Sequence, residues 1–587
     1  METKLHKNLW KYRYKFLIGI LLIVGFNSLQ IQIPKLQGNV IDLLTENSMD
    51  KKALLCYIGI ILLLAVGAFI LTFISQVIIL GITIRFDYDL RGKLFKHILD
   101  LSVNYLSKTG AGEIMALSTN DLRMLRMTLG RGFNMVVSLV ILFVLASYQI
   151  SHVNLKLMLM VMIPFPLTIL VILWFGPIIR RKHILMRESF SELTSLTQEN
   201  ISAVQVIKAF SREKNEIRRF TEKNKKNFQT HLSLIKIGST FHPLIYLVST
   251  LSLVILMFYG GDMVIDEKIT LGEFIACNTY VIMLIHPIAM FGMVVDMTQQ
   301  SRASWKRIAA FLDVTPEIVD KVNEEEFRRT CNDTELFQGD IQFKNLSFKY
   351  DEAIQPALEN ITLTIKHGTS IGIVGKIGSG KTTLVNLIMR LYETDKKDDL
   401  IINGYCIKDI PRSILRESIG YVPQDDFLFS DTINNNIDFN STRQGIEKVK
   451  EAAEASQIHE TILEFVEGYE TKLGERGVNI SGGQKQRLSI ARAIIRDASL
   501  IIMDDCLSAV DTHTEEKIIR GLQEYTKTKT SIIIGHRIST VQHCDQIIVL
   551  EHGRIAEQGS HEELLKYNGL YNEIFEQQRL EEAIENN

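Results

Sequence analysis

The chain has 587 residues, too many for one hydrophobic core, so two or more domains are expected. Apolar residues make up 46% of it and concentrate in the first half, so a membrane part precedes a soluble part. The net charge of -2 provides no electrostatic attraction for nucleic acid, and we expect no such partner. The six cysteines form no paired motif and are expected to be reduced structural thiols.

Six apolar runs are candidates for membrane spans, because crossing the hydrocarbon core takes about 20 apolar helical residues. Lysine and arginine are frequent before the first run and in the long segments 85–132 and 177–239, but rare in the short connections. Positive residues stay inside, so we expect a multi-pass protein of the plasma (inner) membrane with both termini in the cytoplasm. The runs lie near 16–36, 54–84, 133–150, 155–176, 240–264 and 271–298.

The two long cytoplasmic segments carry a helical pattern, as in 188–210, where apolar positions recur every three or four residues. In one interpretation the spans continue as helices beyond the bilayer, and each presents a short helix to a cytoplasmic partner. In the other they form a solvated helical hairpin, and periodicity alone does not decide between the two. We favour the first because of the soluble domain that follows.

From about Gly339 the pattern changes to short β-branched runs separated by glycine and polar turns, which marks a domain boundary. The preceding stretch, Pro316 to Phe337, is the linker. We therefore predict an α-helical transmembrane domain over 1–315, a linker over 316–338 and an α/β domain over 339–587.

A glycine-rich segment, Gly375 to Thr382, stands between the strand-like Ser370 to Val374 and the helical Thr383 to Leu391. In this context glycines let successive backbone N–H groups close around phosphate oxygens at a helix N-terminus. Lys381 adds a cation and the Thr382 hydroxyl can ligate Mg²⁺, so the pattern predicts a P-loop that binds ATP with Mg²⁺. The predicted nucleotide-binding residues are Gly375, Gly378, Ser379, Gly380, Lys381, Thr382 and Thr383.

A second apolar run, Leu500 to Met503, ends in Asp504 and Asp505. A buried parallel strand at this place would deliver an acid to the phosphate-binding edge of a sheet, so Asp504 is the expected metal-side carboxylate. The alternative is a solvated turn, which a P-loop in the same domain makes the weaker interpretation.

A third motif, Ile480 to Gln484, precedes the helical run Gln486 to Arg496 and resembles the LSGGQ signature of ATP-binding cassette (ABC) proteins. With it, nearly the whole chain resembles an ABC exporter half-transporter of the bacterial multidrug type. The resemblance implies a type I exporter fold, with long cytoplasmic helical extensions and a P-loop cassette. It also implies that the signature faces ATP held by a second cassette, through Ser481, Gly482, Gly483 and Gln484.

The same resemblance assigns roles to single positions. Tyr350 resembles the aromatic residue on which adenine stacks, although it could instead pack in the core. Gln424 resembles the glutamine that joins the metal site to the membrane domain, and His536 resembles the histidine that senses the γ-phosphate, although it could be a turn residue. The remaining matches are Thr471 to Gly477 (the exporter-specific loop), Ser508 to Asp511 (the D-loop), and, more weakly, Thr119 to Asp121 and Glu199 to Asn200.

The chain departs from the family at Asp505, where most hydrolysing members have glutamate. A general base must come within about 2.6 to 3.2 Å of the attacking water, and one methylene less can leave it too far away. We expect Asp505, His536 and Gln424 to be catalytic, and Thr382, Gln424 and Asp504 to hold the metal, but hydrolysis at this site to be slow. In the family such a substitution often marks one subunit of a heterodimer whose partner supplies the glutamate. A homodimer with slow but sufficient turnover is the alternative.

The expected function is ATP-driven export of amphipathic small molecules, either drug-like compounds or lipids, by alternating access. The alternatives are a homodimeric lipid or peptide exporter and, with less support, a non-transporting ATP-gated channel or sensor. Besides the second half-transporter, the expected partners are membrane lipids and the substrate. Polar residues in or near the spans could line a pathway or hold the bundle together: Asn27, Gln30, Gln32, Asn278, His286, Asp296 and Gln299.

Overall fold

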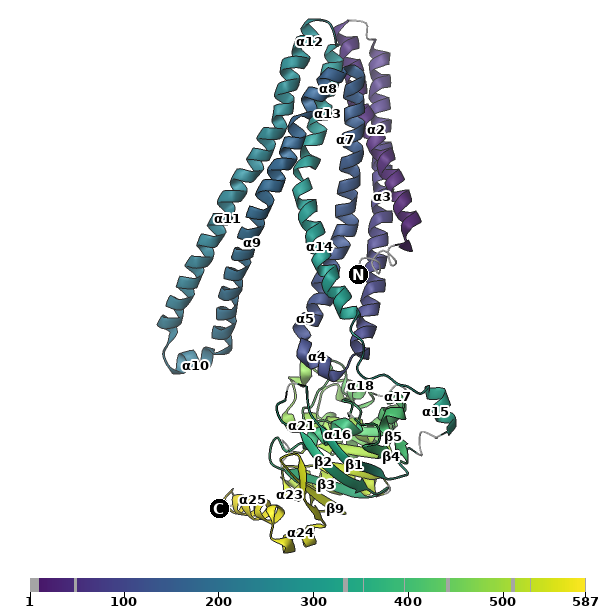
Figure 1. Ribbon diagram of the computed structural model, residues 1–587, viewed down its shortest axis with the longest axis vertical. Helices are drawn as coiled ribbons and strands as arrows, with labels where there is room; N and C mark the ends of the chain where they lie inside the picture. The colour runs from purple at the N-terminus through teal and green to yellow at the C-terminus, as the bar shows by residue number, and fades with distance from the viewer. Residues whose placement is uncertain are drawn as a thin grey trace. The chain divides into compact units, whose positions relative to one another are not determined.

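The computed structural model describes residues 10–46, 50–330, 336–351, 353–394, 396–439, 444–507, 512–527 and 529–585. These residues divide into two compact units, one within Met1–Leu99 and Thr109–Thr315 and the other within Asp100–Lys108 and Pro316–Asn587. The first unit is a bundle of long helices, and the second contains the two sheets (Figure 1). A short segment from the middle of the helical half therefore belongs to the sheet-containing unit.

Within the described residues, six helical segments are long and apolar enough to cross a membrane, which confirms the predicted fold class. Each predicted apolar run lies inside one of them. Several are far longer than the 20 or so residues that a bilayer requires, so they extend beyond it as helices. The segments are Arg13–Thr45, Lys51–Asp100, Ala111–Val153, Leu155–Ser202, Glu213–Ile265 and Leu271–Leu312.

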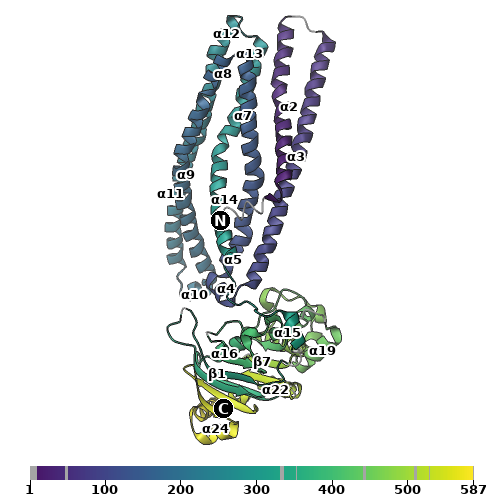
Figure 2. The same cartoon turned by 45° about the vertical axis from the view of Figure 1, so that its right-hand side comes forward.

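The helices of the first unit pack in pairs along their lengths, with α9 against α11 and α2 against both α13 and α7 (Figures 1 and 2). Their apolar surfaces are partly exposed in the isolated chain, as lipid-facing surfaces are. The elements are α2 (Arg13–Thr45), α3 (Lys51–Asp100), α5 (Ala111–Ala116), α6 (Leu122–Met127), α7 (Phe133–Val153), α8 (Leu155–Met162), α9 (Pro164–Ser202), α10 (Val204–Ala209), α11 (Glu213–Ile255), α12 (Gly261–Ile265), α13 (Leu271–Ala289) and α14 (Phe291–Leu312).

Helices α2 and α13 approach each other through two glycines. A Cβ atom on Gly272 would lie 2.1 Å from the Gly38 carbonyl oxygen, so only glycine fits this contact. The α13 N-terminus is capped by Thr270, and Asp42 of α2 accepts hydrogen bonds from the Gly272 N–H and the Thr270 hydroxyl, both at 2.6 Å. The acidic cap and the close contact together fix the first span against the last.

The third span contains two π-helical turns, Leu117–Asp121 and Thr128–Gly132, on its extension toward the α5 end. Both turns are tied to α14. Asp121, which is 5% exposed, accepts hydrogen bonds from Arg307 and from Ser304 at 2.7 Å, and Thr128 donates to the Met297 carbonyl at 3.1 Å. The weak match at Thr119 to Asp121 therefore includes a buried carboxylate that pairs with the half-exposed Arg307 of α14.

Short helices lie at the tips of the two long extensions. At the end of α3, α4 (Val103–Thr109) belongs mostly to the second unit. Between α9 and α11, α10 and the residues beside it expose an apolar surface made by Ile201, Val204, Val206 and Phe210. The structure thus has a short helix at each place where the first interpretation of these segments predicts one.

The second unit contains a four-stranded antiparallel sheet in the order β2-β1-β4-β5 and a six-stranded sheet in the order β10-β9-β3-β8-β7-β6. In the larger sheet β9, β3, β8, β7 and β6 are parallel, and only β10 is antiparallel. The strands are β1 (Ile341–Phe348), β2 (Leu358–Ile365), β3 (Ser370–Gly375), β4 (Leu400–Ile402), β5 (Tyr405–Cys406), β6 (Ile419–Val422), β7 (Leu500–Asp504), β8 (Thr530–Ile534), β9 (Gln546–Glu551) and β10 (Arg554–Gly559).

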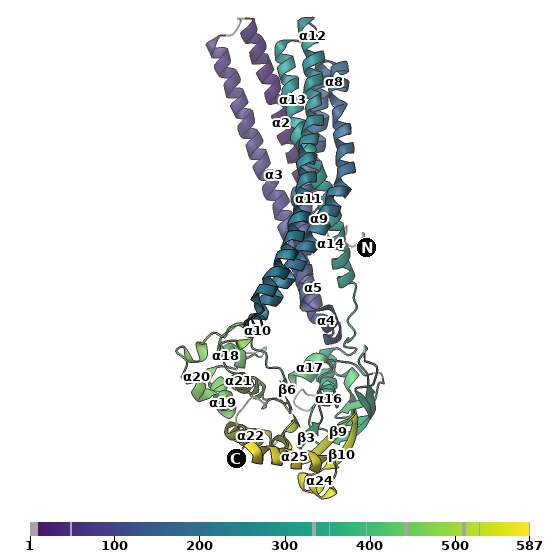
Figure 3. The same ribbon diagram turned by 90° about the vertical axis from the view of Figure 1, so that its left-hand side faces the viewer.

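The second unit contains two main hydrophobic cores. One lies around β1 to β4 and the P-loop helix, and the other is built by the helices α18 to α22 against β6 and β7 (Figure 3). The helices are α15 (Glu324–Thr330), α16 (Lys381–Ile388), α17 (Arg412–Glu417), α18 (Ile433–Ile437), α19 (Ile446–Ala455), α20 (His459–Leu463), α21 (Gly482–Ile494), α22 (Thr512–Thr526), α23 (Ile538–Val541), α24 (His561–Tyr567) and α25 (Leu570–Glu585).

We predict that Gly272→Ala lowers the melting temperature of the detergent-solubilised protein, because the new methyl group must push α2 away from α13. Overpacking of this kind costs about 1 to 3 kcal/mol. Gly59→Ala is the matched control, since a Cβ on Gly59 of α3 meets nothing within 4 Å. Equal melting temperatures for the two variants would contradict the close contact.

Candidate nucleotide-binding site

Four neighbouring parallel strands end at one edge of the larger sheet. In spatial order they are β3, β8, β7 and β6, and the P-loop, His536, the Asp504–Asp505 pair and Gln424 follow them in the same order. Because the carboxyl ends of parallel strands lie on one side, residues from four distant stretches of the chain meet there. This edge is the candidate nucleotide-binding site.

The P-loop backbone has a conformation that requires glycine. Gly380 has a φ of 101°, and a Cβ atom on it would lie 2.6 Å from the Ala357 carbonyl oxygen. A Cβ on Gly375 would lie 2.2 Å from the Leu550 carbonyl oxygen. The loop is therefore held against β2 and β9 in a shape that leaves its N–H groups to close around an anion.

The polar side chains of the loop suit a phosphate. Lys381 is 6% exposed, and its ammonium donates to the carbonyl oxygens of Gly375 at 2.8 Å and Lys376 at 3.1 Å. Burial lowers the pKa of Lys381, and the nearby Asp505 and Asp504 partly oppose that shift. Among the described residues, the buried Ser379 hydroxyl has no hydrogen-bond partner. A hydroxyl without a partner, beside a desolvated cation, fits a phosphate oxygen.

The acid at the end of β7 suits a divalent cation. Asp504 is 1% exposed, and its Oδ2 has no hydrogen-bond partner among the described residues. Burial raises its pKa, while a hydrogen bond with Thr382 opposes the rise. A carboxylate and a hydroxyl that already face each other are oxygen ligands of the kind Mg²⁺ takes. Gln424, the third predicted ligand, is exposed in the loop that follows β6.

Asp505 and His536 face each other at the same edge. The Asp505 Oδ2 lies 3.9 Å from the His536 Nε2, and the Asp505 N–H donates to the Ile534 carbonyl at 2.9 Å. Asp505 has a φ of 48°, in the left-handed region that few non-glycine residues adopt. The sharp turn after β7 thus directs this carboxylate toward the histidine.

Tyr350 lies beside the P-loop helix. Its hydroxyl is 3.1 Å from the Thr383 hydroxyl, and its ring packs edge-on against Phe348 and Tyr392, with centroids 5.0 and 5.1 Å away. The ring packs on aromatic neighbours, as the core-packing interpretation expects. It also lies next to the phosphate loop, which is compatible with stacking on adenine. Next to it, Asp351 accepts hydrogen bonds from Asn104 and Lys108 of α4, both at 2.8 Å.

The signature residues lie at the N-terminus of α21, a helix of the other core. Ser481 is the N-cap of α21, where its hydroxyl accepts from the Gln484 N–H at 3.3 Å and its own N–H donates to the Gln484 side chain at 2.9 Å. This capping box leaves Ser481 and Gly482 exposed at a helix N-terminus. Helix α21 packs in the core of α18 to α22, whereas α16 packs in the core of β1 to β4.

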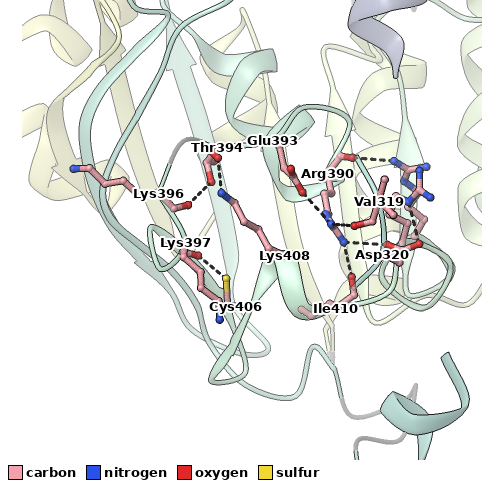
Figure 4. Close-up of polar contacts among 12 residues, drawn as sticks. Val319, Asp320, Arg390, Glu393, Thr394, Lys396, Lys397, Cys406, Lys408 and Ile410 are labelled. Atoms are coloured by element: carbon pink, nitrogen blue, oxygen red, sulfur yellow. Dashed lines mark hydrogen bonds and ion pairs between the residues drawn. The ribbon is translucent and has the colours of Figure 1, made fainter. Parts of the chain in front are cut away.

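An arginine that the motifs do not mark ties the P-loop helix to the segment after the last span (Figure 4). Arg390 follows α16 and is 1% exposed. It donates to Asp320 at 3.1 Å, to Glu393 at 2.9 Å, and to the carbonyl oxygens of Ile410 at 2.8 Å and Val319 at 3.2 Å. Four hydrogen bonds donated by the two terminal nitrogens of this buried guanidinium tie the linker to the helix that begins at Lys381, while its Nε has no partner among the described residues. A lone arginine after a helix offers no sequence signal for this role.

Two of the polar residues predicted in or near the spans, His286 and Asn27, have different surroundings. His286 lines a cavity of about 460 Å³ within the first unit, with Thr72, Gln76 and Asn134 among the other lining residues. Asn27 is buried instead, donates to the Ile23 carbonyl at 2.8 Å, and accepts from Ser138 at 3.2 Å. It therefore holds helices together, as the second interpretation of the polar set expects. The predicted D-loop, Ser508 to Asp511, lies outside the described residues.

Comparison with known proteins agrees with this geometry. The ABC transporter transmembrane region matches residues 16–288, and the ABC transporter family matches residues 358–508. The chain is 34% identical over 573 residues to the probable multidrug resistance ABC transporter ATP-binding/permease protein YheI of Bacillus subtilis (strain 168), which covers 97% of this chain and 96% of that protein. It is 34% identical over 517 residues to the ATP-dependent lipid A-core flippase of Syntrophus aciditrophicus (strain SB), covering 88% of this chain and 83% of that protein.

The solved structure of a bacterial Atm1-family ABC exporter with ATP bound has the same fold, with a TM-score of 0.78 and 24% identity over 97% of this chain and 98% of that one. The chain therefore belongs to the ABC transporter family. It is an exporter half-transporter, a multi-pass membrane protein whose transmembrane region precedes one ATP-binding ATPase domain, the cassette. The resemblance found in the sequence is confirmed at this level.

We predict that Lys381→Ala weakens the binding of ATP to the purified full chain roughly 10- to 100-fold, because charge-assisted hydrogen bonds are worth about 1.5 to 3 kcal/mol. The measurement is titration with Mg-ATP. Lys366→Ala, which removes an exposed lysine just before β3, is the matched control and should leave the affinity unchanged. Wild-type affinity in Lys381→Ala would contradict the P-loop assignment.

Proposed function

We propose that this chain is one subunit of a heterodimeric exporter that uses ATP to move amphipathic small molecules across the plasma membrane by alternating access. The separation of the P-loop and the signature onto the two cores of the cassette supports pairing with a second cassette, and Asp505 in place of the family's usual glutamate supports a different partner chain. A nucleotide on Lys381 needs a second anion site on its exposed side, and a cassette from another chain can supply it. Purification from the native host and identification of the copurifying subunit tests the pairing.

In this proposal the residues of the edge have distinct roles. Lys381, Ser379 and the loop N–H groups hold the phosphates, and Thr382, Gln424 and Asp504 hold Mg²⁺, which supplies charge stabilisation when bound. His536 donates to the γ-phosphate, and Asp505 orients water as the base. Such transfer depends mainly on charge and positioning, so one poorly placed group is enough to slow it.

Asp505 is the poorly placed group. Its backbone N–H bonds the Ile534 carbonyl, which opposes the shift of the turn that would be needed to make up for the missing methylene. ATP would bind well at this site and be hydrolysed slowly. The partner's site, completed by the intact signature of this chain, would then supply most of the turnover.

Coupling to the membrane helices would pass through the two tip helices. Helix α4 is bound to the chain's own cassette, where Ser102 donates to Glu317 at 2.7 Å and Asn104 and Lys108 donate to Asp351 beside Tyr350. Helix α10 exposes Val204 and Val206, which suits docking on a second cassette. Both tips and both termini would then lie in the cytoplasm, where ATP is available.

The substrate would be amphipathic. The cavity beside His286 combines apolar walls with a few polar groups, and the Thr72 hydroxyl there has no hydrogen-bond partner among the described residues. The names of the relatives point to drugs and to a lipid, and both have this character. A homodimeric lipid or peptide exporter is the second candidate, because an intact P-loop and His536 are compatible with turnover at this chain's own site.

We predict that Ser481→Ala or Gly482→Asp in the purified heterodimer reduces ATP hydrolysis far more than Asp505→Asn does. The signature serves the competent site of the partner, where losing one donor costs about 100-fold, whereas Asp505 serves the slow site. The measurement is steady-state ATPase activity. Melting temperatures control for the lost helix cap. If Asp505→Asn alone abolished turnover, this chain's own site would perform most of the ATP hydrolysis, which would contradict the heterodimer proposal.

We further predict that Asp505→Glu increases hydrolysis at this chain's own site, because the added methylene extends the carboxylate toward the attacking water. The increase should be seen in the heterodimer whose partner glutamate has been changed to glutamine. Asp497→Glu, which lengthens an exposed acid elsewhere in the cassette, is the matched control and should have no effect. Unchanged turnover in Asp505→Glu, with ATP still bound, would show that side-chain reach does not limit the site.

A further inference from the structure

The loop that carries His536 is held by one side-chain amide from the last helix of the chain. Gln578 of α25 donates from its Nε2 to the His536 carbonyl at 2.7 Å. Its Oε1 accepts the Ile538 N–H at 2.8 Å. A single amide therefore bonds the backbone both at the histidine and two residues after it, and this fixes the direction in which the loop leaves β8.

Helix α25 is itself anchored, so the amide has a defined position. Glu557 of β10 accepts the N–H groups of Leu570 and Tyr571 at 2.5 and 3.1 Å, which binds the helix N-terminus. Tyr571 is fully buried, and its hydroxyl lies 2.7 Å from the His561 Nδ1. Gln578 follows Tyr571 by two helical turns, so this anchor determines where its amide lies.

The hydrophobic contacts of α25 lead back to the phosphate loop. Tyr571 belongs to a buried cluster that also contains Ile538 and Val541 of α23 and Val374 of β3, directly before the P-loop. The buried Glu515 of α22 accepts from Arg537 at 3.1 Å and Thr540 at 3.0 Å. Glu515 thus bonds the residues after the histidine, and Gln578 bonds the backbone carbonyl of His536 itself.

We propose that Gln578 is a positioning residue for His536, through which the C-terminal helix controls how the site distinguishes nucleotides with and without a γ-phosphate. This rests on the proposed role of His536 as the γ-phosphate donor. Without the amide, the His536 carbonyl and the Ile538 N–H lose their hydrogen-bond partner. The imidazole of His536 is then no longer held in one direction. Contacts to the rest of the nucleotide, made by the P-loop, are unaffected.

The test is the affinity of the purified full chain for AMP-PNP and for ADP, each with Mg²⁺, in Gln578→Ala. We expect AMP-PNP affinity to fall about 10-fold while ADP affinity changes less than twofold. Gln577→Ala is the matched control, because Gln577 is the neighbouring exposed glutamine on α25, and its side chain bonds Glu581 of the same helix at 3.3 Å. It should leave both affinities unchanged. Gln578→Glu, which keeps the acceptor for Ile538, should lie between Gln578→Ala and wild type.

A His536→Ala variant separates the two ways in which the inference can fail. If His536→Ala keeps the wild-type preference for AMP-PNP over ADP, the proposed role of the histidine is wrong and the inference is overturned with it. If His536→Ala loses the preference and Gln578→Ala keeps it, only the inference about Gln578 is overturned. An equal loss of both affinities in Gln578→Ala would mean general damage to the cassette and would also overturn it.

Discussion

Four parallel strands end at one edge of the cassette sheet, and the chemistry of the chain depends on this arrangement. The strand order β3-β8-β7-β6 sets Lys381, His536, Asp505 and Gln424 beside one another, although they are far apart in sequence. Burial strengthens the interactions of Lys381 and Asp504, which are both removed from water, and the P-loop glycines pack directly against the Ala357 and Leu550 carbonyl oxygens. The edge therefore brings a buried lysine, two carboxylates and an imidazole together at the carboxyl ends of the strands.

Around that edge, buried or charged side chains hold the P-loop helix and the histidine loop in place. Arg390 joins the P-loop helix to the linker, and Glu515 and Gln578 hold the histidine loop. In the membrane region polar residues serve packing in a similar way. Asp42 caps α13, and Asp121 pairs with Arg307 where the third span becomes π-helical. These two acids connect one helix to another, whereas many threonine hydroxyls of the long helices bond a carbonyl of their own helix.

The sequence allowed the spans and the phosphate loop to be predicted, because both follow from local rules. A span needs an apolar run of sufficient length, and a P-loop needs glycines and a lysine between a strand and a helix. The contacts of Arg390 and Gln578 could not be predicted, since each depends on which distant backbone atoms the fold brings near. For Asn27 the sequence left two roles open, and only the position of Ser138 on a neighbouring helix chose between them. The limits of the linker stay a prediction.

The contacts between the α4 segment and the cassette constrain the order in which the cassette unit folds during synthesis. The α4 segment is synthesised before its partners. Glu317, which bonds Ser102, follows it by 215 residues, and Asp351, which bonds Lys108, follows it by 243. Four membrane spans must be inserted between these events. The cassette unit therefore folds onto a segment that has already been synthesised. A cassette produced alone from Pro316 onward would leave the carboxylates of Glu317 and Asp351 without these partners, so the isolated domain is an incomplete copy of the unit that folds in the whole protein.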